Sequence, residues 1–509
     1  MFDYNLSIID TILKTGASTA MTEKQFFEME IKNWKKSKER AEQITGQNYY
    51  HGKHDILKRK RTVIGKDGLL QEVDNLPNNK LIDNQYAKMV DQKTNYLLGQ
   101  PLTFDTNNDG YENALRDIFN KRFHRVLQNI GEDSLNCGIG WLYVYYDETG
   151  EFCFKRFEPH ECLAFWQDLD HTQLKCFVRV YTLEGYEGTV RTTIEKVEVY
   201  KPTGIERYIL TSGGTLIDDV ENPSSDYMVH DDGSEEGQGF NWGRIPVIGF
   251  KYNDKEIPLI RKVKSLQDAI NVTLSDFENN MQEDSRNTIL IIKNYDGQNL
   301  AEFRYNLATF GAVKVKSIDG ADGAVEALQV QVNSDNYRVL LELLKNALIE
   351  NAMGYDAKDD RMMGTPNQMN IQSMYSDVDL DANGMETEYQ ASFEELLWFV
   401  NAHLANTGKG NFETVDLSVI FNRDMMFNEI EIMTMLFQGG VRISNETLLS
   451  QVPFLDDVKQ ELERLKDEQQ ENFDVYGGAF GNVNGNVNGN VNSNKLVTND
   501  GSNAGGSNA

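Results

Sequence analysis

The block from residue 257 to residue 366 constrains the fold most, because two long amphipathic stretches in it bracket a short β-rich module. In each stretch the apolar residues recur every three or four positions, which places them on one face of a helix. The first set is Leu259, Val263, Leu266, Ile270, Leu274, Phe277 and Met281, and the second is Tyr337, Leu340, Leu344, Leu348 and Ala352. We therefore expect two helices that pack as an antiparallel pair.

The module between the two helices favours strands. Residues 288–292 read Thr-Ile-Leu-Ile-Ile, and the Asp-Gly pair at 296–297 is a typical turn. Residues 312–316 form a second strand candidate. A short β-rich unit is therefore expected at the far end of the helix pair.

A loop with glycine at both ends follows the second helix, at residues 354–364. It mixes Lys358 and Arg361 with Asp356, Asp359 and Asp360. Glycine permits hinging, and mixed charge lets a loop approach phosphates without binding them tightly. Taken alone, the same residues also fit an ordinary surface loop.

The rest of the chain alternates between helical and β-rich parts, so the predicted fold class is α+β. Turn signals separate β-branched and aromatic runs between residues 140 and 252, which predicts a largely antiparallel β region. Further helices are expected at residues 22–45 (closed by Gly46), 83–98, 367–407, 425–437 and 458–470. A strand at 102–104 is expected to lead through a loop to a helix that ends at residue 136, and another strand is expected at 415–421. The Gly- and Asn-rich residues from 477 to 509 cannot bury enough apolar surface to fold, so a disordered tail is expected.

Composition narrows the range of partners. The 509 residues carry 50 basic and 79 acidic side chains, a formal charge of −29, so a broad nucleic-acid-binding surface is excluded. The four cysteines, Cys137, Cys153, Cys162 and Cys176, have no C-x-x-C spacing and are interpreted as reduced buried thiols in a cytoplasmic compartment. The sequence shows neither a run of about 20 apolar residues nor a secretory signal, so no membrane association is expected.

Several motifs resemble sites of chemistry, but each is incomplete. The run from Asn406 to Gly410 lacks the first glycine and the Ser or Thr of a phosphate loop, so a helix end and turn are favoured. Two runs that start at Asp105 and Asp379 match the first half of a calcium loop, yet position twelve is Arg116 and Gln390 rather than Glu. An Asx-rich turn and a bent, solvated helix are the simpler interpretations.

Histidine positions give equally weak signals. His51 and His54 lie in a basic stretch and read as solvated surface, and the run from His160 to Cys162 reads as a strand edge. No catalytic order of residues stands out, so we predict no enzyme activity, no cofactor and no metal.

Four segments resemble the portal proteins of tailed bacteriophages, in the branch typical of long-tailed phages of Gram-positive hosts. They are Val90-Asp-Gln-Lys-Thr-Asn-Tyr-Leu-Leu-Gly99 with Pro101 and Phe104, Lys293-Asn-Tyr-Asp-Gly297 with Glu302 and Phe303, Asn406-Thr-Gly-Lys-Gly-Asn-Phe412, and Ser444-Asn-Glu-Thr447 through Pro453 and Phe454 to Glu461. They keep their order, and the resemblance covers residues 34–474. The Gly- and Asn-rich tail departs from it, because relatives are acidic there.

The resemblance implies a portal fold with a mixed α/β wing, an antiparallel stem helix pair, a small α/β clip and a helical crown. The implied boundaries are 1–257 for the wing, 258–287 and 333–353 for the stem helices, 288–332 for the clip, 354–365 for a tunnel loop, 366–422 for a long kinked helix and the return to the wing, 423–474 for the crown and 475–509 for the tail.

The resemblance also implies a function, namely a ring of twelve subunits at one capsid vertex, assembled in the host cytoplasm, through which double-stranded DNA is packaged and ejected. The implied partners are a terminase, a head–tail adaptor, and the major capsid and scaffolding proteins. The tunnel-loop candidates are Lys358, Asp359, Asp360, Arg361 and Met362, and the docking candidates in the clip are Lys293, Tyr295, Asp296, Glu302 and Arg304. Two alternatives stay open at this point, a scaffold or head-completion protein without a channel and a nuclease that acts during packaging.

Overall fold

The computed structural model describes residues 21–64, 68–74, 76–230, 238–284, 289–293, 324–328, 334–356, 368–423, 462 and 464–465. The chain divides into two compact units, Met1–Met426 and Phe427–Ala509. Of the second unit, only residues 462, 464 and 465 belong to the described part. Among the described residues, no helix is both long and apolar enough to cross a bilayer.

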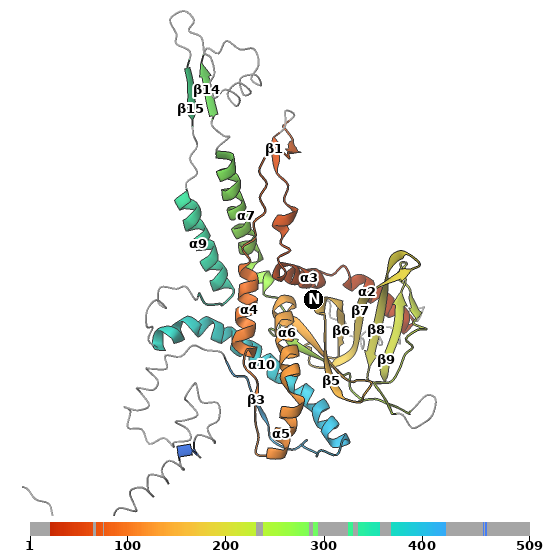
Figure 1. Cartoon of the computed structure of the whole chain (residues 1–509). Helices are drawn as coiled ribbons and strands as arrows, with labels where there is room; N and C mark the ends of the chain where they lie inside the picture. Colours follow the sequence, from red (N-terminus) through yellow and green to blue (C-terminus); the bar gives the residue numbers. More distant parts are fainter. Residues whose placement is uncertain are drawn as a thin grey trace, which may run out of the picture. The chain divides into compact units, whose positions relative to one another are not determined.

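The first unit combines helices with antiparallel sheets, which confirms the predicted α+β class (Figure 1). Its helices are α2 (Glu23–Trp34), α3 (Lys38–Tyr50), α4 (Gln85–Leu98), α5 (Asp109–Ile118), α6 (Lys121–Cys137), α7 (Ile260–Asp284), α9 (Ser334–Asn351) and α10 (Gln368–Asn406), with 3-10 turns η1 (Asp55–Lys58) and η2 (Pro159–Glu161). Its strands are β1 (Thr62–Ile64), β2 (Leu70–Glu72), β3 (Thr103–Asp105), β4 (Ile139–Tyr146), β5 (Phe152–Phe157), β6 (Cys162–Trp166), β7 (Leu174–Glu187), β8 (Val190–Lys201), β9 (Gly204–Leu210), β10 (Leu216–Asp218), β11 (Met228–His230), β12 (Gln238–Phe240), β13 (Val247–Lys251), β14 (Ile289–Lys293), β15 (Ala324–Leu328) and β16 (Ser418–Ile420).

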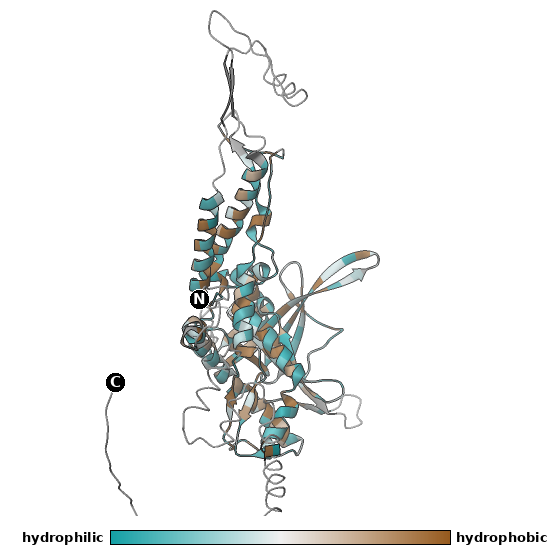
Figure 2. Ribbon diagram, turned by 60° about the vertical axis from the view of Figure 1, so that its left-hand side comes forward, coloured by the Kyte–Doolittle hydropathy of each residue, from teal (hydrophilic) through white to brown (hydrophobic). Residues whose placement is uncertain are grey.

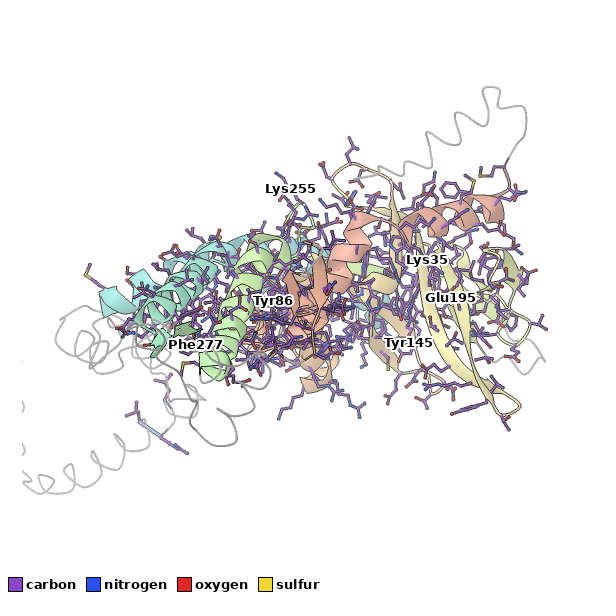
Figure 3. All side chains as sticks on the ribbon, turned by 90° about the horizontal axis from the view of Figure 1, so that it is seen from above. Lys35, Tyr86, Tyr145, Glu195, Lys255 and Phe277 are labelled. Carbon is purple, nitrogen blue, oxygen red and sulfur yellow. The ribbon has the colours of Figure 1, made fainter. Side chains whose placement is uncertain are left out.

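The predicted β region is a five-stranded sheet, in the order β10-β9-β8-β7-β6, beside a three-stranded sheet, β13-β4-β5. Helix α2 covers one face of the larger sheet through Phe26, Phe27 and Trp34, and the pair Lys35–Glu195 ties its C-terminal end to β8 (Figure 3). The other face packs against the smaller sheet around Trp141 and Phe177. Buried residues on one face of β7 and β8 therefore pack in the core under α2, and those on the other face pack in the core shared with the smaller sheet.

The prediction of a single helix over residues 22–45 is wrong, because two helices, α2 and α3, occupy that region. The side chain of Ser37 accepts a hydrogen bond from the Arg40 amide and begins a second helix, which runs through Gly46 to Tyr50. Gly46 does not end a helix. A Cβ built there would lie 2.0 Å from the Asn136 carbonyl oxygen, so glycine is needed for the close packing of α3 on α6.

His54 also departs from its expected surface position, whereas His51 is exposed as predicted. The His54 ring is only 1% exposed and stacks on Tyr49 with the ring centroids 4.4 Å apart. Its Nε2 lies 2.9 Å from the Tyr49 carbonyl oxygen, and the Asn271 side-chain amide donates to its Nδ1. Burial lowers the pKa of His54, which agrees with a neutral ring that donates through Nε2.

Both amphipathic stretches are helices, and α7 and α9 pack side by side (Figure 1). The Tyr337 ring near the start of α9 meets Phe277 near the end of α7, with centroids 5.0 Å apart, so the helices run in opposite directions. Hydrophobic and hydrophilic residues alternate along both ribbons (Figure 2). Met281, expected on the inner face, is 52% exposed. Strands β14 and β15 pair antiparallel beyond α7, while residues 312–316 lie outside the described part.

The face of α7 that looks away from α9 is buried as well, although it is polar. Gln267, Asn271, Ser275 and Asn279 recur every four residues and are 0% exposed. Their oxygens accept from the backbone amides of Tyr86, Asp83, Leu81 and Asn79 at 2.9, 3.1, 2.9 and 2.8 Å. We call these four side chains the α7 ladder. Four residues of helix rise about 6 Å, close to the advance of two residues in an extended chain, which matches the steps from Asn79 to Leu81 and from Leu81 to Asp83. The last step, to Tyr86, spans three residues and reaches the first turn of α4.

We expect Asn271→Ala to destabilise the first unit by about 1–3 kcal/mol, because it leaves the Asp83 amide and the buried His54 ring nitrogen without their partner. Urea unfolding at a fixed protein concentration measures this loss. Asn346→Ala, an exposed amide on α9, is the matched control and should change the free energy of unfolding by less than about 0.5 kcal/mol. Equal effects of the two substitutions would contradict a structural role for the ladder.

Candidate functional site

The residues proposed for the tunnel loop, Lys358, Asp359, Asp360, Arg361 and Met362, lie outside the described residues. The same holds for Tyr295, Asp296, Glu302 and Arg304 of the predicted clip, whereas Lys293 is the last residue of β14. The structure does describe both flanks of the 357–367 segment, namely the end of α9 and the start of α10. These flanks are held by one helix, α4.

The end of α9 approaches α4 closely. Met353 has a φ of 53°, the left-handed conformation that ends helices, and Gly354 follows it. A Cβ built on Gly354 would lie 2.6 Å from the Met89 sulfur and 2.9 Å from the Gln92 Oε1 atom, so a larger residue would force these two side chains to shift. The Gln92 side chain then makes two hydrogen bonds to the Tyr355 backbone, at 3.0 Å to its amide and 2.9 Å to its carbonyl.

Lys93 is the buried cation of this junction and is only 4% exposed. Its ammonium group donates to the Met353 carbonyl at 3.0 Å and to the Asp381 carboxylate on α10 at 2.7 Å. Tyr252 donates to the same carboxylate at 2.8 Å. Burial lowers the pKa of Lys93, and the attraction of Asp381 opposes that shift. One side chain therefore connects the end of α9 to the middle of α10.

Asp379, two residues before Asp381 on α10, is also bound by protein donors. Tyr96 of α4 donates to its carboxylate, and Arg423 contacts it at 2.6 Å. Arg423 also pairs with Glu386 at 2.6 Å. The run from Asp379 thus lies inside α10 as expected, but its carboxylates are engaged by protein donors, so the expectation of a solvated helix is wrong. Arg423 pairs with Asp379 and Lys93 pairs with Asp381, so cations of the protein engage both carboxylates of the calcium-like run.

Aromatic rings complete the junction. The Tyr375 ring on α10 lies 4.6 Å from the Tyr355 ring and stacks on Tyr96 of α4 at 5.7 Å. Tyr375 is 2% exposed. Residues before and after the 357–367 segment therefore share one buried cluster, which we call the α4 junction: Met89, Gln92, Lys93, Tyr96, Met353, Gly354, Tyr355, Tyr375, Asp379 and Asp381.

Other sequence motifs have structural roles. At the end of α10, Gly408 has a φ of 71° and the Lys409 amide donates to the Leu404 carbonyl, so residues 406–410 form the expected helix end. Asp105 ends β3, and Asn108 caps α5. The run from His160 begins in η2 rather than on a strand edge. The cysteines are free thiols, with Cys137, Cys162 and Cys176 buried and Cys153 partly exposed.

A cavity of about 210 Å³ lies between Gln173, Pro202, Arg244 and Glu395. Burial raises the pKa of Glu395 to about 7, and Arg244 counteracts part of that rise. Within the described ranges, no three His, Cys, Asp or Glu side chains come together as a metal site. A single shifted carboxyl group in a small cavity does not make a catalytic set.

The comparisons with known proteins point the same way as the resemblance of the four segments. Residues 30–473 match the family model described as phage portal protein, SPP1 Gp6-like. The chain belongs to this family of portal proteins. It is similar to the portal protein of Bacillus phage SPP1, with 29% identity over 439 residues that cover 85% of each chain. It is also similar to the portal protein of Clostridium phage phiCD119, with 24% identity over 434 residues that cover 83% of this chain and 91% of the relative.

Phage portal proteins are structural components of the virion and form oligomeric rings in capsids. The α4 junction was not among the predicted site residues. A signal for it was nevertheless present, because Gln92, Lys93 and Tyr96 lie within the segment 90–99 that carried the portal resemblance. A lysine inside an otherwise apolar helical face, as at Lys93, is a pattern that indicates a buried partner.

We expect Lys93→Met to destabilise the portal chain by about 3–5 kcal/mol, because it leaves the Asp381 carboxylate, which is 11% exposed, without its buried charged partner. Lys262→Met is the matched control, since Lys262 lies 4.0 Å from the same carboxylate but is 38% exposed, and it should cost less than about 1 kcal/mol. Thermal and urea unfolding measure both. Adding Asp381→Leu should recover part of the loss, and a Lys93→Met variant as stable as the control would refute the buried pairing.

Proposed function

We propose that the chain is the subunit of a ring-shaped DNA channel at one capsid vertex, in which double-stranded DNA is packaged and later ejected. The family match over residues 30–473 carries this proposal. Assembly takes place in the host cytoplasm, and a ring of twelve copies is the expected state.

In this proposal α7 and α9 are the stem helices, within residues 258–287 and 333–353. The clip comprises residues 288–332, with β14 and β15 at its base, and the wing comprises residues 1–257. Residues 354–365 form the tunnel loop, residues 366–422 the long helix and the return to the wing, and residues 423–474 the crown. The packing of α7 on α9 and the continuity of α9, the α4 junction and α10 support this assignment.

The α4 junction supports a channel role for the segment between α9 and α10. A loop that presents side chains to passing DNA must be fixed at its base, or its position would vary between copies. Gln92 and Lys93 fix the backbone of residues 353–355, and Tyr96 fixes α10 through Asp379 and Tyr375. The two flanks of the loop thus belong to one packed cluster.

The charge of the chain supports transport rather than tight binding. Each copy carries −29, so twelve copies carry roughly −350 before counter-ions. Such a ring repels a phosphate backbone, and DNA can then slide past local, transient cationic contacts. Lys358 and Arg361 supply those contacts in this proposal.

Replacing both Lys358 and Arg361 by alanine should strongly reduce the amount of packaged DNA while rings still assemble, because the backbone contacts are lost but the subunit fold is kept. Nuclease-protected DNA in assembled particles measures packaging, and negative-stain images count the rings. A Lys38→Ala/Arg116→Ala variant, which removes two exposed cations from the described part of the wing, is the control. Unchanged packaging in the loop variant would remove these two residues from the mechanism.

The energy for transport comes, in this proposal, from a separate terminase that docks on the clip. Lys293, Tyr295, Asp296, Glu302 and Arg304 are the proposed docking residues, and a head–tail adaptor takes the same surface after packaging. The capsid and scaffolding proteins surround the wing.

Deleting residues 296–307 should abolish the retention of the large terminase subunit in a pulldown with assembled rings, since the deletion removes most of the proposed docking residues. Deleting the tail, residues 477–509, should leave retention at the wild-type level. Terminase that stays bound to the first deletion variant would place docking elsewhere on the portal.

A further inference from the structure

Helix α9 carries an apolar stripe on the side that does not face α7. Val339, Leu340 and Leu343 are 50%, 45% and 62% exposed. The side that packs on α7 carries Tyr337, Leu341 and Leu344 instead. Three neighbouring aliphatic side chains on one exposed helical face are unusual for a surface in contact with water alone.

A second exposed feature of the same region is the segment 53–81, which we call the arm. It contains η1 and the hairpin β1–β2, and the α7 ladder binds its C-terminal end. Leu57, Leu70 and Leu81 are 45%, 71% and 41% exposed. The arm holds seven basic and four acidic residues, so it is locally positive in a chain whose formal charge is −29.

The arm and the α9 stripe lie at the same level along α7. The Leu81 amide bonds Ser275, and Tyr337 packs on Phe277 and accepts from Asn280 at 2.9 Å. Val339 follows Tyr337 by two residues, a rise of about 3 Å, which brings it level with Ser275.

The two features nevertheless contact different sides of α7. Ser275 and Asn279 point to the arm, whereas Phe277 and Asn280 point to α9, and these directions differ by roughly 150° around the helix. Helix α7 therefore stands between the arm and α9 of the same chain.

We propose that the arm of one copy covers the α9 stripe of the next copy, so that neighbouring stems make a head-to-tail contact. This inference rests on the proposed ring, because a heterologous contact of this kind closes only by rotation about a central axis. The charges fit, since Lys80 of the arm is exposed, as are Glu342 and Glu350 of α9. Lys58 and Lys60 of the arm already pair with Asp55 and Glu72 of the same chain. Exposed leucines on both surfaces supply the apolar part of the contact.

Disulfide trapping tests the contact directly. In the full-length Leu81→Cys/Val339→Cys variant, oxidation of assembled rings should give a ladder of covalent multimers on a denaturing gel, and reduction should remove the ladder. The control is Leu81→Cys/Val220→Cys, because Val220 is 90% exposed and lies in the wing. The wild-type chain, with three buried cysteines and one partly exposed, gives the background.

Charge reversal provides a second test that does not need a disulfide. Lys80→Glu and Glu342→Lys should each lower the fraction of protein in rings, and the double variant should restore it. All these positions are exposed, so circular dichroism should show an unchanged fold.

The outcomes separate the contact from the ring itself. A wild-type chain that forms no rings in negative-stain images would end the proposed function and this contact with it. Rings that form but give no ladder, or give one equally with the Val220 control, would overturn the contact alone. Failure of the double charge reversal to restore rings would also count against it.

Discussion

The hydrogen bonds between the α7 ladder and the backbone of residues 79–86 are the constraint on which the rest of the first unit depends. The ladder connects three parts of the chain to α7. These are the arm, the first turn of α4 through the Tyr86 amide, and α3 through His54, which contacts both Asn271 and the Tyr49 carbonyl. Because every ladder side chain is buried, a shift of the segment along α7 would leave several ladder oxygens without partners, each at a cost of about 1–3 kcal/mol. The ladder therefore fixes one register, which an apolar contact of equal area would not do.

Helix α4 connects the α7 ladder to both flanks of the segment between α9 and α10. Its first turn is set by Gln267 and by the cap residue Asn84, and its later turns carry Gln92, Lys93 and Tyr96. The positions of α7, the end of α9 and the start of α10 are thus linked through one rigid element. In the proposed assignment, the contacts that position the stem helices therefore also position the base of the tunnel loop.

Periodicity in the sequence was sufficient to predict the helices of residues 85–98, 260–284 and 334–351 and the antiparallel β region, because each buries one continuous apolar face. It failed wherever polar side chains are buried. Asn271 and Ser275 look like the solvated face of an amphipathic helix, and His54 looks like part of a basic surface. Nothing local indicates their partners, which lie about 200 residues away in sequence. At the α4 junction the lysine in an apolar face indicates that a buried partner exists but not which residue it is, since Lys93 and Asp381 are 288 residues apart.

The acidity of the chain bears on assembly as much as on DNA. Copies that each carry −29 repel one another, so a ring can form only where local surfaces overcome that repulsion at short range. Screening at physiological ionic strength limits the repulsion to about 8 Å, a distance at which apolar contact and opposite local charge both act. In the proposed contact, the positive arm attracts the neighbouring copy at the stem helices, while the proposed ring as a whole stays repulsive to DNA. The same charge distribution then serves assembly and transport without a dedicated DNA-binding surface.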